Sequence, residues 1–215
     1  MGKKFVMSYS CGKDSTLALH KMVEAGHQPL ALLVMVNEAA GRSFFHGADD
    51  RLLDRYEQAL GIPLLRVPTA GETYHLAMEE ALRNARIMGA EMAVFGDIDI
   101  EGNRAWSQER CDHTGLEACF PLWHSGREEN VAELLRCGYR AIIKSIHNTQ
   151  LPRELLGRFL DEETVQIMAG CGVDVCGENG EYHTLTLDGP VFRTPVSCRT
   201  GEILDFGEYS VIDLY

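Results

Sequence analysis

The segment from Ser10 to Ser15, with the sequence SCGKDS, has the residue types of a phosphate-binding loop. It follows a short apolar run at residues 5–7 and precedes residues 16–23, whose apolar side chains recur at helical spacing. A strand, a polar turn and a helix start bring free backbone N–H groups and the positive end of the helix dipole together. Lys13 adds a full positive charge, and Gly12 lets the backbone approach a ligand closely. The sequence therefore predicts that this loop holds the phosphates of a nucleotide.

Two common phosphate-loop patterns do not fit this segment. A Walker A loop needs a glycine five residues before the Gly-Lys pair, where this chain has Met7, and the GxGxxG pattern does not fit either. An alternative interpretation is that Asp14 or Ser15 only caps the helix. Capping is compatible with phosphate binding, so this alternative does not exclude a nucleotide site.

Gly96 and Asp97 follow the apolar run at residues 92–95, which predicts a fourth strand. In a doubly wound sheet this strand lies beside the first one. Ligands bind such sheets at the carboxyl ends of the strands, where the strand order reverses. Because a carboxylate is a hard oxygen ligand, Asp97 is a candidate to hold Mg²⁺ on the phosphates of ATP. A turn-forming aspartate is an equally good interpretation of the same pattern.

Glu178, Glu181 and His183 lie within six residues on a glycine-flanked turn and the strand that follows it. Two carboxylates placed in this way can bind a metal ion or an ammonium ion, or remove a proton from an attacking amine. A plain hairpin turn at Asn179-Gly180 is the simpler alternative. On spacing alone, His183 is better interpreted as a hydrogen-bonded core histidine than as a catalyst.

Apolar runs alternate with helical periodicity through the first half of the chain. Strands are predicted at residues 5–7, 30–36, 64–67, 92–95 and 118–122, helices at residues 16–23, 49–60, 73–88 and 107–114, and a long loop at residues 37–48. Continuous apolar runs are typical of strands that are covered on both faces. Repeated βα units of this length predict an α/β fold with a doubly wound parallel sheet.

The second part of the chain has a different pattern, beginning near residues 124–126. We expect helices at residues 127–137 and 155–168, strands at residues 140–146 and 182–187, and short antiparallel strands near the C-terminus. These elements predict a smaller C-terminal α+β domain. The predicted domains are therefore residues 1–125, which bind the nucleotide, and residues 126–215, which bind the substrate.

Composition narrows the classes of function. The formal charge of −12 argues against general nucleic-acid binding or binding to anionic membranes, since both need a cationic surface. The longest apolar runs are too short to span a bilayer and no signal pattern is evident, so a cytoplasmic protein is predicted. The seven cysteines are scattered without a CxxC pair, which favours free thiols over zinc sites or disulfides.

The loop resembles the SGGKDS signature of the ATP pyrophosphatase (PP-loop) superfamily, with Cys11 where that signature has glycine. Further segments appear in the same order as in one family of these proteins. They are Ser43-Phe44-Phe45-His46, Gly96-Asp97-Ile98, Pro121-Leu122-Trp123 and the GENGEYHT segment from Gly177 to Thr184. Together they resemble the diphthine–ammonia ligase family over nearly the whole chain.

The resemblance implies a Rossmann-like domain of the adenine nucleotide alpha hydrolase-like kind and a C–N bond-forming ligase. ATP would convert a carboxylate to an acyl-adenylate, with release of pyrophosphate, and free ammonia would then displace AMP. It implies a nucleotide site that includes Mg²⁺ on Asp97 and these residues: Ser10, Cys11, Gly12, Lys13, Asp14, Ser15, His46 and Gly96. Lys13, Asp97, Glu178, Glu181 and His183 are the candidate catalytic residues. The family's named acid is diphthine on elongation factor 2, and a homodimer is the default expectation.

Two other functions fit parts of the pattern. A PP-loop tRNA-modifying enzyme, either a thiolase or a lysidine synthetase, would need a basic RNA-binding surface and, for a thiolase, a reactive cysteine pair. A non-catalytic ATP sensor could use the same fold, because fold does not determine function. The acidic charge and the missing CxxC pair count against the first alternative.

Overall fold

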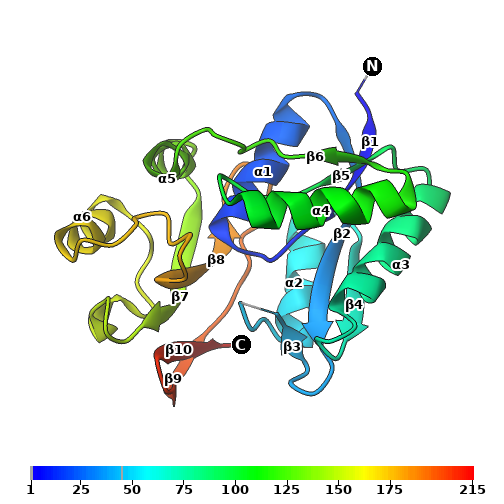
Figure 1. Ribbon diagram of the computed structural model, residues 1–215. Coiled ribbons are helices and arrows are strands. Elements are labelled where there is room, and N and C mark those ends of the chain that lie inside the picture. The colour runs from blue at the N-terminus through cyan, green and yellow to red at the C-terminus, as the bar shows by residue number, and fades with distance from the viewer. Residues whose placement is uncertain (1, 45) are drawn as a thin grey trace.

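The computed structural model describes residues 2–44 and 46–215, and this part of the chain folds around two β-sheets (Figure 1). Phe45, which belongs to the Ser43–His46 motif, lies outside the described residues. The larger sheet contains β1 (Lys4–Ser8), β2 (Gln28–Asn37), β3 (Arg42–Ser43), β4 (Leu64–Thr69), β5 (Met92–Val94) and β6 (Glu117–Cys119).

The larger sheet has the strand order β3-β2-β1-β5-β6, with β4 paired to β2. Strand β1 is parallel to β2 on one side and to β5 on the other, so the strand order reverses at β1. Pairing of β1 stops opposite Leu33, but β2 continues to Asn37. Because β4 occupies the other edge of β2, the short antiparallel β3 lies just beyond the end of β1. As a result, the segment that follows β3, which includes His46, lies next to the loop at residues 9–12.

Helices cover both faces of the larger sheet. They are α1 (Lys13–Glu24), α2 (Asp50–Leu60), α3 (Tyr74–Ile87) and α4 (Glu101–Thr114). Side chains alternate along β1, so Phe5 and Met7 pack with α1 and α2, while Val6 packs with α3 and α4. The predicted α/β fold with a doubly wound parallel sheet is confirmed.

The smaller sheet is antiparallel, with the order β8-β7-β10-β9. Its strands are β7 (Arg140–His147), β8 (Tyr182–Asp188), β9 (Thr200–Phe206) and β10 (Tyr209–Leu214), and it is accompanied by α5 (Arg127–Arg136), the 3₁₀ turn η1 (Arg153–Leu155) and α6 (Glu162–Gly170). Helix α1 packs against both β8 and α5 (Figure 1). The buried cluster around α1 and α2 continues into β7 and β8, so one apolar core joins the two sheets. The domain division at residues 125/126 stays a prediction.

Several predicted boundaries differ from the structure. Helix α6 begins at Glu162 instead of residue 155, because Asp161 and Thr164 form a capping box there. Helix α4 begins at Glu101 instead of residue 107. Its first turns are mostly exposed and lack periodic apolar residues, so the sequence pattern does not indicate that they are helical. Strand β6 ends at Cys119, before Pro121, and the loop predicted at residues 37–48 contains β3.

Among the described residues, we find no helix that is both long enough and apolar enough to cross a bilayer. All seven cysteines are free thiols, as the sequence predicted.

Candidate active site

A cavity of about 830 Å³ lies at the carboxyl ends of β1, β2 and β5 and is closed by residues from β8. Its volume falls within the range of ligand pockets, which is about 300–1,000 Å³. Nine of the predicted site residues line it: Ser10, Lys13, Asp14, Ser15, His46, Gly96, Asp97, Glu178 and His183. Cys11, Gly12 and Glu181 lie directly behind this lining and support it, as shown below.

The phosphate loop is held by its own hydroxyl groups. The Ser10 and Ser15 Oγ atoms lie 3.1 Å apart, the Gly12 N–H donates to Ser10 Oγ over 3.3 Å, and Ser15 Oγ donates to the Gly12 carbonyl over 3.1 Å. Gly12 is the N-cap of α1, and the Lys13 N–H donates to Thr184 Oγ1 on β8 over 3.1 Å. The smaller sheet therefore contributes directly to the position of the loop.

Cys11 has the backbone conformation that favours glycine. Its φ is +67°, in the left-handed region, and its side chain is fully buried in the core. The Thr186 N–H on β8 donates to the Cys11 carbonyl over 2.8 Å, which ties this conformation to the smaller sheet. Burial raises the pKa of the Cys11 thiol, so the group stays protonated and packs as an apolar side chain. Cys11 thus holds the left-handed conformation that the glycine of the SGGKDS signature would adopt without strain.

We expect Cys11→Gly to keep its turnover and to change the free energy of unfolding by no more than about 1 kcal/mol. Relief of a left-handed residue, worth about 1–2 kcal/mol, offsets the loss of one buried side chain. Cys11→Val is the matched control, because a branched side chain at this φ should cost about 2 kcal/mol. Urea denaturation of both variants measures the difference, and equal stability of the two would contradict this explanation.

His46 packs against the phosphate loop because position 12 has no side chain. A Cβ atom on Gly12 would lie only 2.5 Å from His46 Cε1. His46 Nδ1 lies 2.7 Å from the Thr184 carbonyl, which can only accept, so Nδ1 carries the hydrogen and Nε2 is free to accept one. Burial, together with His183 and Lys13, lowers the pKa of His46 to about 3. The ring is therefore neutral, and its centroid lies 5.1 Å from that of His183.

Lys13 is a buried cation at the start of α1. Its Nζ lies 2.6 Å from Asp14 Oδ2 and 5.6 Å from the centre of the Tyr182 ring. Burial acts to lower the pKa of Lys13, but its neighbours, first among them the Asp14 carboxylate, together outweigh burial and raise the pKa well above its usual value. The ammonium group is therefore charged throughout the physiological pH range.

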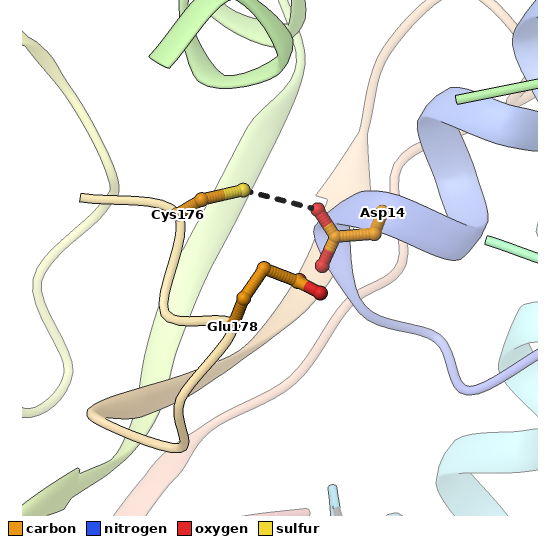
Figure 2. A group of neighbouring side chains, drawn as sticks. All are labelled: Asp14, Cys176 and Glu178. Carbon is orange, nitrogen blue, oxygen red and sulfur yellow. Dashed lines mark hydrogen bonds between the residues drawn. The ribbon is translucent and has the colours of Figure 1, made fainter. Parts of the chain in front are cut away.

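Asp14, Cys176 and Glu178 converge beside this lysine (Figure 2). The Cys176 thiol lies 3.7 Å from Asp14 Oδ1, and Glu178 extends from the acidic turn toward the same carboxylate. Burial, and then repulsion from Asp14, raises the pKa of Glu178 to about 7. A carboxylate with this pKa can take up and release a proton at neutral pH, as a general base requires.

The same three residues are a poor site for Mg²⁺. Burial raises the pKa of Cys176, so its sulfur stays a protonated, soft donor, whereas Mg²⁺ prefers hard oxygen ligands. Asp97 fits better, because it lines the cavity and, among the described residues, its carboxylate has a single hydrogen-bond partner, Ser107 Oγ at 3.3 Å. Burial raises the pKa of Asp97, and a divalent cation would favour the ionised form. A Cβ atom on Gly96 would lie 3.1 Å from the Ser15 nitrogen, so this segment directly abuts the phosphate loop.

Glu181 holds the acidic turn in shape. It is buried, and its carboxylate accepts the Asn179 N–H and the Asn179 side-chain amide at 3.0 Å each, and the Asp174 N–H at 3.3 Å. These bonds fold residues 174–181 into a loop that presents Glu178 to the cavity. His183 also lines the cavity, in contrast to the core position that spacing alone favoured.

Arg127 connects the two sheets at the edge of the site, and sequence analysis did not identify it. Its guanidinium makes a bidentate pair with Asp99 at 2.7 and 2.8 Å and a further bond with Asp174 at 2.6 Å. Asp99 follows Asp97 by two residues, and Asp174 accepts the Glu178 N–H at 3.1 Å. One side chain thus fixes the distance between the Asp97 loop and the Glu178 loop.

Replacing Arg127 with methionine should lower turnover by about 10- to 100-fold, because a displacement of about 1 Å at a reacting group has effects of this size. Arg136→Met is the control on the same helix. Its exposed pair with Glu129, at 2.7 Å, should contribute little. Steady-state rates of the two variants test this, and equal rates would show that Arg127 does not position the site.

The far end of the cavity is aromatic and was also missed by sequence analysis. Phe44, Tyr74 and Trp106 line it, with ring centroids 5.3 Å apart for Phe44 and Tyr74 and 5.7 Å apart for Tyr74 and Trp106. His75 also lines the cavity. These side chains come from three separate elements, so no local pattern connects them.

A phosphate-loop sequence at the reversal point of a doubly wound sheet, beside a cavity with polar and aromatic side chains, is typical of α/β proteins of the PP-loop type. The chain belongs to the diphthamide synthase family. The family model for the diphthamide synthase N-terminal domain matches residues 2–118, and the model for the diphthamide synthase C-terminal domain matches residues 127–214.

Similar proteins include the diphthine–ammonia ligase of Bos taurus, which is 26% identical over 220 residues covering 91% of this chain and 82% of the relative. The diphthine–ammonia ligase of Danio rerio is 27% identical over 217 residues, covering 87% and 83%. A crystal structure described as a predicted subunit of tRNA methyltransferase from Methanocaldococcus jannaschii covers 90% of this chain and 100% of its own, with a TM-score of 0.47 and 13% identity. A likeness of this extent adds nothing to the fold described above.

Proposed function

We propose that this chain is an ATP-dependent amide ligase of the diphthine–ammonia ligase type. The observation that carries the proposal is that residues of the phosphate loop, among them Lys13, and residues of the acidic turn and β8, among them Glu178 and His183, line one cavity although they come from different sheets. The names of the relatives support diphthine as the acid and ammonia as the nitrogen source. Elongation factor 2 is the proposed carrier of the diphthine.

In the first step, a carboxylate oxygen of the substrate attacks the α-phosphorus of ATP and pyrophosphate leaves. The Lys13 ammonium and the N–H groups of Asp14 and Ser15 in the first turn of α1 would stabilise the charge that develops on pyrophosphate. Mg²⁺ held by Asp97 would neutralise further phosphate charge. The aromatic end, with Phe44, Tyr74 and Trp106, suits the adenine ring.

In the second step, ammonia attacks the carbonyl of the acyl-adenylate. A C–N bond forms, the C–O bond to AMP breaks, and AMP leaves with that electron pair. The nitrogen must lose a proton as the amide forms, and Glu178 is the carboxylate whose pKa suits it to accept one. Glu181 supports this step indirectly, by holding the turn that carries Glu178.

A thiolase function is not favoured by the cysteines nearest the loop. Cys11 and Cys176 are buried, and burial raises the pKa of both thiols, whereas sulfur transfer needs an accessible thiolate. A non-catalytic sensor would bind ATP without consuming it, and product analysis separates that alternative from a ligase.

Mass spectrometry of diphthine-bearing elongation factor 2 tests the proposal. After incubation with the protein, ATP, Mg²⁺ and ammonium chloride, the carboxylate should become the amide, and omission of any one component should prevent this. Failure to form the amide in the complete mixture would contradict the proposal. The homodimer also stays a prediction, which the molar mass in solution would test.

A further inference from the structure

A second cavity, of about 320 Å³, adjoins the candidate active site. It lies between the segment at residues 37–47 and strands β7, β9 and β10. Ser43, Phe44 and His46 line both cavities and therefore form the partition between them. At about 30 Å³ per molecule, the second cavity has room for on the order of ten waters.

The floor of this cavity is a row of side chains that leads to His183. Directly paired residues in antiparallel strands share a face, and the register pairs His183 with Ser145, Ser145 with Val211, and Val211 with Leu204. The first member lines the main cavity, and the other three line the second one. The two cavities thus lie over one continuous face of the smaller sheet.

A β-bulge shapes the polar part of the floor. The pairing of β7 with β8 shifts between Ile143 and Ser145, so Lys144 is the extra residue and both Lys144 and Ser145 line the cavity. Regular strands would point these neighbours to opposite faces. Ser145 is only 5% exposed, and within the described chain its hydroxyl has no hydrogen-bond partner. Because buried hydroxyl groups are normally hydrogen-bonded, a small polar ligand or a water molecule is expected to bind the Ser145 hydroxyl.

The charges around the cavity disfavour a small cation. Arg42 and Lys144 line it, and the Asp213 carboxylate pairs with Arg42 at 3.0 Å. The Lys144 amine donates to the Ile212 carbonyl, and burial lowers its pKa to about 8, with Arg42 adding to this effect and Asp213 opposing it. The remaining walls include Phe44, Leu204, Phe206 and Val211, so a neutral amine is favoured over a charged one.

We propose that the second cavity is the entrance through which neutral ammonia reaches the reacting carbonyl, passing Ser145 and His46. The Ser145 hydroxyl can donate to the ammonia lone pair, and His46 Nε2 can accept one of its hydrogens. The main cavity must hold the acyl-adenylate when ammonia reacts, so a separate entrance lets ammonia arrive while that intermediate stays bound. This inference rests on the proposed function and adds a route for its second substrate.

The test is to fill the second cavity from two positions in its floor. Val211→Trp and Ser145→Leu each place bulk in the floor, while Ile203→Trp places it on the neighbouring row, outside both cavities. With diphthine-bearing elongation factor 2 as acceptor, both filling variants should raise KM for ammonia by about 10-fold or more, and the control should not. Acceptor-dependent exchange of pyrophosphate into ATP should stay within about twofold of wild type, since adenylation needs no ammonia.

Two results would overturn the entrance while leaving the proposed function intact. One is an unchanged KM for ammonia in both filling variants when their exchange activity and thermal unfolding match wild type. The other is a raised KM for the acceptor with an unchanged KM for ammonia, which would assign the cavity to the acid. If the wild-type protein showed no acceptor-dependent exchange, this would instead contradict the proposed ligase function. The proposed ammonia entrance, which rests on that function, would then fail as well.

Discussion

Lys13→Ala is expected to lower pyrophosphate release by about 10²- to 10³-fold, the usual effect of removing one group that stabilises transition-state charge. Lys13 is the cation of the phosphate loop, it lines the cavity, and its neighbours keep it charged. Without it, the charge that develops on the leaving pyrophosphate loses the nearby ammonium group and is stabilised by backbone N–H groups and the proposed Mg²⁺ alone. Initial rates of pyrophosphate release at saturating ATP measure the effect.

Two further variants separate catalysis from folding. Lys13→Met keeps an unbranched side chain against Tyr182 but removes the charge, so it should lose as much activity as Lys13→Ala and unfold closer to wild type. Lys21→Ala changes a lysine on the same helix that pairs with Glu133 at 2.6 Å, outside the cavity, and should be fully active. Normal turnover in Lys13→Ala would show that the phosphate loop has no catalytic role.

Glu178→Gln is expected to reduce amide formation by about 10²-fold, a typical loss for a general base. Glutamine keeps the shape of the side chain but cannot accept the proton. Adenylation precedes this step, so acceptor-dependent exchange of pyrophosphate into ATP should change by no more than about twofold. Equal loss of both activities would place Glu178 in the ATP site or in the fold.

The pH dependence of the same variant gives an independent test. A pKa of about 7 means that Glu178 is protonated, and inactive as a base, below this pH and ionised above it. With rates expressed per neutral ammonia, kcat/KM should rise as the pH increases through about 7 and then level off. The inflection should be missing in Glu178→Gln, and its persistence would assign it to another group.

Glu181→Gln is the comparison for both measurements. Its carboxylate accepts hydrogen bonds from within residues 174–181, so a neutral amide should loosen the whole turn. We therefore expect exchange and amide formation to fall together and the thermal unfolding temperature to decrease. A selective loss of amide formation would instead give Glu181 a role in the chemistry.

Local patterns were sufficient to predict much of this molecule. The phosphate loop is a strand, a turn and a helix start in sequence order, and Gly96-Asp97 follows a continuous apolar strand. Both features depend on neighbours along the chain, and parallel topology then places them at the same edge of the sheet. The capping box of Asp161 and Thr164 is equally local, and this pair of residues indicates a helix that begins at Glu162.

The parts that were missed depend on distant residues. Arg127 meets Asp99 and Asp174 across 28 and 47 residues of chain, and no spacing in the sequence signals such a pairing. His183 has the strand spacing that places it on one face with Leu185 and Leu187, which suggested a core position. The face that it shares with Ser145 is instead the one that the cavities occupy. Tertiary placement, which a single sequence does not specify, decides both cases.

The most direct test of the proposed ligase is to follow α-labelled ATP during amidation of diphthine-bearing elongation factor 2 and to separate the nucleotide products by chromatography. Activation through an acyl-adenylate predicts AMP in equal amount to the amide, and no AMP without the acceptor. Formation of ADP in place of AMP, or of the amide without any consumption of ATP, would contradict it.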